Sequence, residues 1–307
     1  MVNIKSVFHR LIYAQNWNIG FCFITPERLL EEGALPRVRW LKHNYRDRWF
    51  ADPFLFKITE TDYRVFAEEL FINSGKGQIV ELYIDRHSFK LKKRYLILEL
   101  DTHLSFPIWY EKDNQIFVYP ENGQSGKLSL YRYNEDVHSL EFIKVIVEDS
   151  LADSVIFENK EKYYLLATRA SNSLSGTYLY ESSAIDGLYM EKEGNPIITG
   201  IDISRSAGNM IKVGGKIYRP VQNCIKRYGG GISLIELSDN FGFKRIVSSI
   251  IPNSWRYNLG IHTINFMNNV CVVDSYGFLY PIFGRIYYSK IITKLKLLFF
   301  KRKTSDN

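Results

Sequence analysis

The stretch Trp49-Phe50-Ala51-Asp52-Pro53-Phe54-Leu55-Phe56 places one carboxylate directly before a short apolar run. Such a run, bounded by polar residues, is typical of a buried β-strand. A second apolar run, residues 63–66, follows a polar break and ends in Glu68-Glu69, so that the two runs predict an antiparallel hairpin. The start of the first strand and the end of the second lie at one edge of such a hairpin. We place the functional site at this edge.

The hairpin pattern recurs four more times along the chain, at residues 106–121, 152–169, 207–223 and 262–274. Equivalent positions in the five copies are spaced by roughly 50 residues, which is the spacing of propeller blades. Four copies also carry polar residues at both ends of one edge, sixteen positions apart: Asp52 and Glu68, Ser105 and Glu121, Asp153 and Arg169, Ser206 and Gln222. The fifth copy, from His262 to Asp274, is shorter.

Further strand-like runs lie between the hairpins, at residues 78–84, 127–133, 177–181 and 231–237. Four strands in each of five repeats predict an all-β fold, a five-bladed β-propeller. The alternative is a β-sandwich of unrelated hairpins. We expect residues 1–48 to form a lead-in packed on the propeller, residues 49–281 to form the propeller, and residues 282–307 to form a basic amphipathic C-terminal helix and tail.

Composition limits the class of protein. Hydrophobic residues make up 46% of the 307 residues and aromatic residues 15%, which favours many short strands over helices. The three cysteines show no CxxC spacing, so the sequence indicates neither a disulfide framework nor a structural zinc site. No secretion signal or membrane-spanning run is visible, so we expect a cytoplasmic protein.

The net charge of +7 is unevenly distributed along the sequence. One basic cluster comprises Arg37, Arg39, Lys42, Arg46 and Arg48, and a second extends from Lys290 to Lys303. Basic clusters bind nucleic acid, anionic lipid or phosphorylated substrates, and charge alone does not choose among them. The C-terminal helix has the pattern of an anchor at an anionic membrane surface, here the inner face of the cell membrane; a helix packed on the propeller is the alternative. Without an RNA-binding motif we expect no nucleic-acid partner.

Several of these motifs together resemble a known family. They are the stretch 49–56, Ser105-Phe106-Pro107 with Tyr119-Pro120-Glu121, residues 152–157 with 166–168, and Arg205-Ser206-Ala207-Gly208 with residues 218–224. The family is the N-terminal domain of plant glucosamine inositolphosphorylceramide transferase with its stand-alone bacterial relatives, which are similar to proteins of surface-polysaccharide loci. More distantly, the chain resembles the five-bladed propellers of family 43 glycoside hydrolases.

The resemblance implies carbohydrate-active chemistry. Family 43 hydrolases use a base, a second Asp and a general-acid Glu; Asp52 and Asp153 match the first two, and residues 205–208 contain no Glu. In the plant enzyme the recognised glycosyltransferase fold is a separate C-terminal domain, so the resemblance leaves open whether the propeller itself is catalytic.

The missing acid favours transfer over hydrolysis. Hydrolysis of a glycoside requires an acid to protonate the leaving oxygen, whereas the diphosphate of a nucleotide-sugar leaves without a proton and needs cationic stabilisation. We therefore expect a glycosyltransferase with a nucleotide-sugar donor, a lipid-linked acceptor and Asp52 or Asp153 as base. The cationic residues for this role are Arg169, Arg205, Arg219 and His262, and the expected saccharide contacts also include Glu68, Glu69, Glu121, Ser206, Gln222 and Asp274.

Other interpretations of these residues stay open. A glycosidase could use Glu68, Glu69 or Glu121 as its acid, and a propeller could bind saccharides without catalysis. Asp52 before Pro53 is also typical of a turn cap, and the glutamates could satisfy backbone groups at a blade edge. Arg205 and Arg219 could pair with Asp202 or Asp274, and His262 could be a core histidine. No metal ligand set is apparent, although the sequence does not decide whether an ion lies on the axis.

Overall fold

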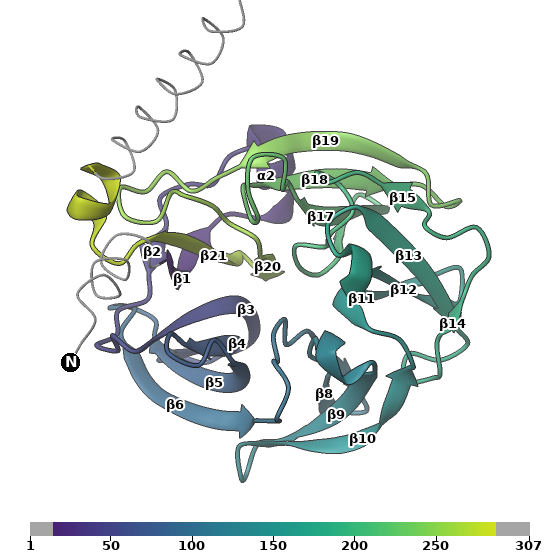
Figure 1. Ribbon diagram of the computed structural model, residues 1–307, viewed down its shortest axis with the longest axis horizontal. Coiled ribbons are helices and arrows are strands. Elements are labelled where there is room, and N and C mark those ends of the chain that lie inside the picture. Colours follow the sequence, from purple (N-terminus) through teal and green to yellow (C-terminus); the bar gives the residue numbers. More distant parts are fainter. Residues whose placement is uncertain (1–14, 287–307) are drawn as a thin grey trace, which may run out of the picture.

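The computed structural model of the protein describes residues 15–286. Its strands form five antiparallel sheets arranged around a central axis, which confirms the predicted five-bladed β-propeller (Figure 1). Residues 281–286 are helical, and the rest of the predicted C-terminal helix, including Lys290 to Lys303, lies outside the described residues. Within 15–286 no helix is long and apolar enough to cross a membrane.

The first four blades follow one another along the chain. Blade 1 contains β3 (Arg48–Ile58), β4 (Asp62–Phe71), β5 (Gly77–Asp85) and β6 (Leu91–Leu98). Blade 2 contains β7 (Trp109–Lys112), β8 (Gln115–Val118), β9 (Leu128–Asn134) and β10 (Ser139–Val147). Blade 3 contains β11 (Leu151–Asn159), β12 (Lys162–Arg169) and β13 (Gly176–Ser182), with β14 (Met190–Glu191) and β15 (Ile198–Thr199) both paired to β13. Blade 4 contains β16 (Ile211–Val213), β17 (Lys216–Gln222), β18 (Ile232–Leu237) and β19 (Phe243–Ile250).

Blade 5 joins the two ends of the described chain. Its inner strands are β20 (Ile264–Met267) and β21 (Val270–Phe278), and its outer strands are β1 (Gln15–Phe23) and β2 (Arg39–Trp40). β1 pairs with β21 along its whole length, from Gln15 opposite Phe278 to Phe23 opposite Val270. The segment predicted as a lead-in therefore contains two strands of a blade and the helix α2 (Pro26–Glu32) between them. This pairing closes the ring, because it joins the two ends of the described chain in one sheet.

Aromatic side chains pack the spaces between blades. Phe54 of blade 1 meets Phe106 of blade 2 edge to face, with ring centroids 4.9 Å apart. Phe56 and Phe66 stack at 3.9 Å, and Tyr133 of blade 2 packs edge-on against both. Large flat side chains remove much apolar surface from water at such interfaces, which explains the high aromatic content.

A residue with positive φ recurs at the inner edge of the first three blades, and in blades 1 and 3 it lies in a bulge. Asp52, Phe106 and Asp153 all have a positive φ, at 48°, 47° and 47°. Strand pairing shifts register between Ala51 and Phe54 in blade 1, and between Ala152 and Val155 in blade 3. Bulges redirect side chains at strand ends. In this fold they carry the carboxylates of Asp52 and Asp153 to the axis.

Candidate functional site

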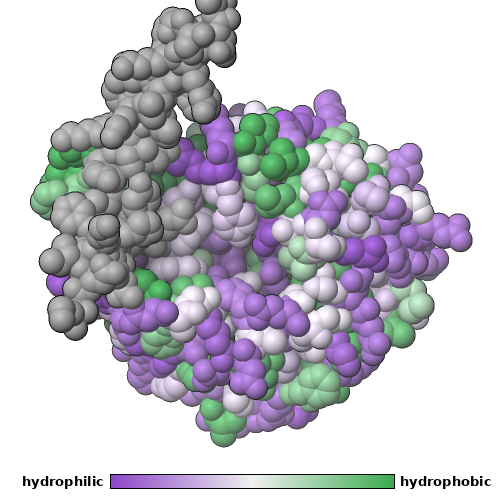
Figure 2. All heavy atoms as spheres, in the orientation of Figure 1, coloured by the Kyte–Doolittle hydropathy of each residue, from purple (hydrophilic) through white to green (hydrophobic). Residues whose placement is uncertain are grey.

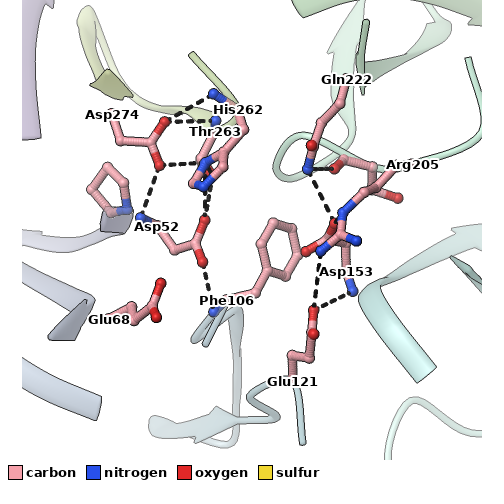
Figure 3. Close-up of polar contacts among 12 residues, drawn as sticks. Asp52, Glu68, Phe106, Glu121, Asp153, Arg205, Gln222, His262, Thr263 and Asp274 are labelled. Carbon is pink, nitrogen blue, oxygen red and sulfur yellow. Dashed lines mark hydrogen bonds and ion pairs between the residues drawn. The ribbon is translucent and has the colours of Figure 1, made fainter. Parts of the chain in front are cut away.

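Acidic residues from four blades surround the propeller axis. They are Asp52 and Glu68 of blade 1, Glu121 of blade 2, Asp153 of blade 3 and Asp274 of blade 5, and they lie with the cationic Arg205 and His262 (Figure 3). We call these seven residues the central cup. Figure 2 shows a hollow near the centre of this face, bordered mainly by hydrophilic side chains.

Asp52 lies within a network of hydrogen bonds that connects blades 5, 1 and 2. Its Oδ1 accepts from the hydroxyl of Thr263 at 2.5 Å, and its Oδ2 accepts from the main-chain N–H of Phe106 at 3.1 Å. Burial raises the pKa of Asp52, and so do the negative charges of Asp274 and Asp153, while His262 and the Thr263 hydroxyl oppose the shift. A carboxylate with a raised pKa is a better proton acceptor at neutral pH.

His262 forms a short ion pair with Asp274. Its Nδ1 lies 2.6 Å from Oδ2 of Asp274 and 3.5 Å from Oδ1 of Asp52. Burial acts to lower the pKa of the imidazole, but the two carboxylates outweigh it and raise the pKa to about 9. The ring is therefore a cation at neutral pH, and it stacks on Trp17 with centroids 4.0 Å apart.

Asp274, Asp52 and His262 are close enough together to be considered as a metal site. Both oxygens of Asp274, however, already accept protein hydrogen bonds: Oδ1 from the N–H groups of His262 and Thr263, and Oδ2 from the N–H of Asp52 and from Nδ1 of His262. A metal ligand must be a deprotonated imidazole, and the raised pKa of His262 opposes this. This donor set fits a buried ion pair better than a metal site.

The opposite side of the cup is organised around Asp153. Its Oδ2 pairs with Nε of Arg205 and accepts from Nε2 of Gln222 at 3.1 Å. Glu121 accepts the main-chain N–H of Asp153 at 2.9 Å and lies 3.8 Å from the Arg205 guanidinium. Burial raises the pKa of Asp153 to about 7, even though Arg205 acts to lower it. Asp153 therefore titrates near neutral pH.

Glu68 is a buried acid beside Asp52. Burial, followed by the charges of Asp52 and Glu121, holds its pKa well above the usual value, which favours the protonated carboxyl. Its Oε1 lies 3.3 Å from Nε2 of His103. Because Nδ1 of His103 accepts the N–H of Gly77, the neutral ring carries its proton on Nε2, the nitrogen nearest to Glu68. The carboxyl O–H of Glu68 is thus a candidate proton donor.

Comparison with known proteins gives the family. Residues 38–245 match the family described as "Glucosamine inositolphosphorylceramide transferase 1, N-terminal". The chain belongs to this family. It is 26% identical over 202 residues to glucosamine inositolphosphorylceramide transferase 1 of Oryza sativa subsp. japonica, and 27% identical over 195 residues to the Arabidopsis thaliana protein. These matches cover 63% and 62% of this chain but only 27% and 25% of the relatives, so the chain spans about a quarter of their length.

Two solved structures with a similar fold are glycoside hydrolases. Zg3597, a family 117 glycoside hydrolase from Zobellia galactanivorans, superposes with a TM-score of 0.54 at 10% identity, covering 86% of this chain and 92% of that one. CoXyl43, a family 43 β-xylosidase/α-arabinofuranosidase from a compost metagenome, gives 0.51 at 14% identity, covering 74% and 90%. At these identities the likeness concerns the fold alone.

In this member of the family, some of the residues expected at the site lie away from the cup. Glu69, the neighbour of Glu68, points to the other face of the blade, where it is fully buried and pairs with Arg48 and Arg94. Arg169 pairs with Asp149 and Glu191 instead. These ion pairs give Glu69 and Arg169 a role in stabilising their blades rather than in binding a ligand in the cup.

Arg219 and Ser206 lie behind the cup rather than on its surface. Arg219 has no exposed surface and donates to the carbonyl of Ser204 at 2.6 Å and to the hydroxyl of Ser206 at 2.9 Å. Ser206 in turn accepts Nε2 of Gln222 through its carbonyl at 3.0 Å. The two residues thus position Gln222, which contacts Asp153.

Sequence reasoning missed four contributors to the central cup. Thr263 and the N–H of Phe106 orient Asp52, Trp17 stacks on His262, and Tyr228 packs edge-on against His262 at 5.4 Å and under Arg205 at 5.2 Å. Phe106 occupies the position of Asp52 and Asp153 in its own blade, and the roughly 50-residue repeat could have identified it. Trp17 had no such signal, because it lies on the strand that closes the ring.

Proposed function

We propose that the central cup binds a saccharide and that this protein takes part in glycosyl transfer during assembly of a cell-surface polysaccharide or glycolipid. The observation that carries the proposal is the pairing of Arg205 with Asp153. A cation, rather than a carboxylic acid, extends from blade 4 into the cup. This arrangement supports chemistry in which the leaving group departs as an anion, as the diphosphate of a nucleotide-sugar does.

Asp52 is the base in this proposal. Each of its oxygens accepts one protein hydrogen bond, from Thr263 or Phe106, and keeps a lone pair for a substrate hydroxyl. The bond from the anomeric carbon to the donor phosphate breaks, a bond to the acceptor oxygen forms, and the acceptor proton passes to Asp52. The His262 cation offsets the negative charge beside the reacting atoms, and it is held in place by Asp274.

A second candidate function is glycoside hydrolysis. It is favoured by the raised pKa of Glu68, which favours a protonated carboxyl next to the Asp52 carboxylate. An acid and a base from two carboxyl groups are what hydrolysis requires. Against it, the side chain of Glu68 is only 6% exposed and lies 3.3 Å from Nε2 of His103.

One assay separates the candidates. The protein is incubated with a panel of nucleotide-sugars and a lipid-linked acceptor, and in parallel with aryl glycosides. Nucleotide release that depends on the acceptor and is lost in Asp52→Asn supports transfer. Release of the aryl group that is lost in Glu68→Gln supports hydrolysis, and saccharide binding with neither product supports a binding module. Asp186→Asn, which alters a partly exposed ion pair with Lys112 outside the cup, is the matched control.

The relatives named as transferases are about four times as long as the matched region, so their activity as whole proteins is not assigned to the propeller. An inactive propeller that binds the acceptor saccharide would be consistent with a role in glycosyl transfer carried out with another protein or domain. Measuring saccharide affinity for the wild type and for Asp153→Asn tests this role without requiring turnover.

A further inference from the structure

A second cavity lies outside the central cup, beside β2 and the end of β21. Its volume is about 900 Å³. Its walls include five cationic side chains, Arg37, Arg39, Lys42, Arg46 and Arg256, together with His43 and His87. None of the described residues that line it is an aspartate or a glutamate. We call this cavity the basic cleft.

The cations of the basic cleft lack counter-ions within residues 15–286. The nearby carboxylate of Asp47 pairs with Arg48, which does not line the cleft. No ion pair with a described carboxylate is formed by the five cleft cations Arg37, Arg39, Lys42, Arg46 and Arg256. Cations gathered in a cavity repel one another, and an anionic ligand relieves that repulsion.

His43 adds a neutral hydrogen-bonding group to the cleft. Burial lowers its pKa, and the charge of Arg256 lowers it further. Its Nδ1 is buried without a hydrogen-bond partner. The amides of Asn16 and Asn18 also line the wall.

Large apolar side chains border the cleft and face solvent. Tyr280 lines it and is 41% exposed, and Ile282 and Phe283, directly beyond it in the chain, are 61% and 69% exposed. Trp255, next to Arg256, is 61% exposed and lies under the guanidinium of Arg285. We call Trp255, Tyr280, Ile282 and Phe283 the apolar lip. Clustered exposed apolar residues of this size mark interaction surfaces.

We infer that the basic cleft and the apolar lip together bind the surface of a membrane that contains anionic phospholipid. The cleft receives a phosphate headgroup, to which arginine donates paired hydrogen bonds, and the lip enters the interfacial layer, where Trp and Tyr are favoured. A soluble phosphate compound would use the cleft but would gain nothing from the lip. The combination of cations and exposed apolar residues therefore favours a lipid surface. This inference does not depend on the chemistry of the central cup.

Co-sedimentation with vesicles tests the inference on the full chain. Vesicles of phosphatidylcholine are compared with vesicles that also contain phosphatidylserine. We expect binding to the second kind only, weakened by salt. Arg39→Glu/Arg46→Glu should weaken it by about tenfold or more, since each basic residue near such a surface contributes roughly fivefold. Ile282→Ser/Phe283→Ser should weaken it as well. Lys212→Glu/Lys244→Glu, which reverses two exposed charges on blade 4, is the matched control and should bind like the wild type.

Three results would overturn the inference. One is vesicle binding that survives Arg39→Glu/Arg46→Glu but is lost when Lys290, Lys294 and Lys296 are replaced by Gln, which would assign membrane contact to the C-terminal segment. Another is binding of uridine diphosphate or inositol phosphate that Arg39→Glu/Arg46→Glu abolishes, without any binding to vesicles, which would make the cleft a site for a soluble ligand. The third is equal binding to both kinds of vesicle. Circular dichroism melting of each variant verifies that it is folded.

Discussion

The carboxylate of Asp52 accepts the main-chain N–H of Phe106, 54 positions later in the chain, at 3.1 Å. Asp274 accepts the N–H of Asp52 in the same way at 3.0 Å, and Glu121 accepts that of Asp153 at 2.9 Å. Three acidic residues of the cup thus each hold the inner edge of the next blade. Because the same carboxylates serve the fold and the candidate site, their substitution is expected to change both stability and ligand binding.

Asp274→Asn should be among the most destabilising single changes in the cup. The substitution removes the charge that faces His262 and disturbs four hydrogen bonds to a fully buried carboxylate. Breaking a buried ion pair from one side costs about 3–5 kcal/mol. Urea unfolding monitored by tryptophan fluorescence measures the change. A loss below about 1 kcal/mol would contradict the role given to Asp274, and Asp186→Asn at the partly exposed pair with Lys112 serves as the control.

Stability should fall as the pH rises from about 7 to 9. His262 has an ordinary pKa of 6.5 when unfolded and a pKa of about 9 in the fold. Its ion pairs therefore contribute their full stabilisation below pH 6.5, and this contribution is lost as the pH rises through 9. The raised pKa corresponds to a contribution of about 3 kcal/mol at most. Unfolding free energies measured across this range should slope downward in the wild type, and the slope should flatten in His262→Gln. An unchanged slope in the variant would rule out His262 as its source.

Glu68→Gln should stabilise the protein at neutral pH. Folding raises the pKa of Glu68. The free energy of unfolding of the wild type therefore falls as the pH rises above the ordinary pKa of a glutamate. The amide of Gln resembles the protonated carboxyl and avoids this cost. We expect the variant to exceed the wild type by about 1 kcal/mol or more at pH 8 and to match it near pH 4. Denaturant unfolding at both pH values gives the comparison, and a variant less stable at pH 8 would show that Glu68 is ionised in the fold.

Arg205→Met should destabilise the cup much more than the equivalent change at a surface pair. Arg205 is the only cation paired with Asp153 among the described residues, and both side chains are nearly buried. Removing it leaves a buried carboxylate without a counter-charge, at a cost of about 3–5 kcal/mol. Arg245→Met, which breaks the more exposed pair with Asp202, should cost less than about 1 kcal/mol. The double variant Arg205→Met/Asp153→Asn should recover part of the loss, and its failure to do so would show that the pair is not the source of the effect.

Gly208→Ala should disrupt the contact between blades 4 and 5. Gly208 has a φ of 136°, and a Cβ there would lie 2.0 Å from the carbonyl oxygen of Ile264 in blade 5. The backbone must move, so we expect a loss of about 2 kcal/mol or more. Gly126→Ala, at a φ of 71° with open space around it, should cost about 1 kcal/mol. Thermal melting of both variants tests the difference, and equal losses would mean that the inter-blade contact is adaptable.

Much of the architecture could be predicted from local sequence pattern. The alternation of apolar runs and polar turns is a short-range property, and its roughly 50-residue period predicted the five blades and the edge that carries Asp52, Asp153 and His262. The fifth repeat, however, supplies only β20 and β21, and its missing strands come from β1 and β2 at the other end of the chain. No local signal reports a pairing between Gln15 and Phe278, because ring closure is a contact between distant segments.

Which residues enter the site depends on the register of each strand, because a shift by one residue turns a side chain to the other face. Successive side chains of a strand point to opposite faces, so Glu68 enters the cup while Glu69 joins the ion pairs with Arg48 and Arg94. In blade 1 Glu68 pairs with Ala51, the residue before Asp52. In blade 3 Thr168, and not Arg169, pairs with Ala152, the residue before Asp153, so Thr168 holds the position that Glu68 has in blade 1. The sequence by itself determined which edge of each blade is polar. The tertiary structure decided which of those side chains meet and which charges they share, because burial and the distances between blades exist only in the closed ring.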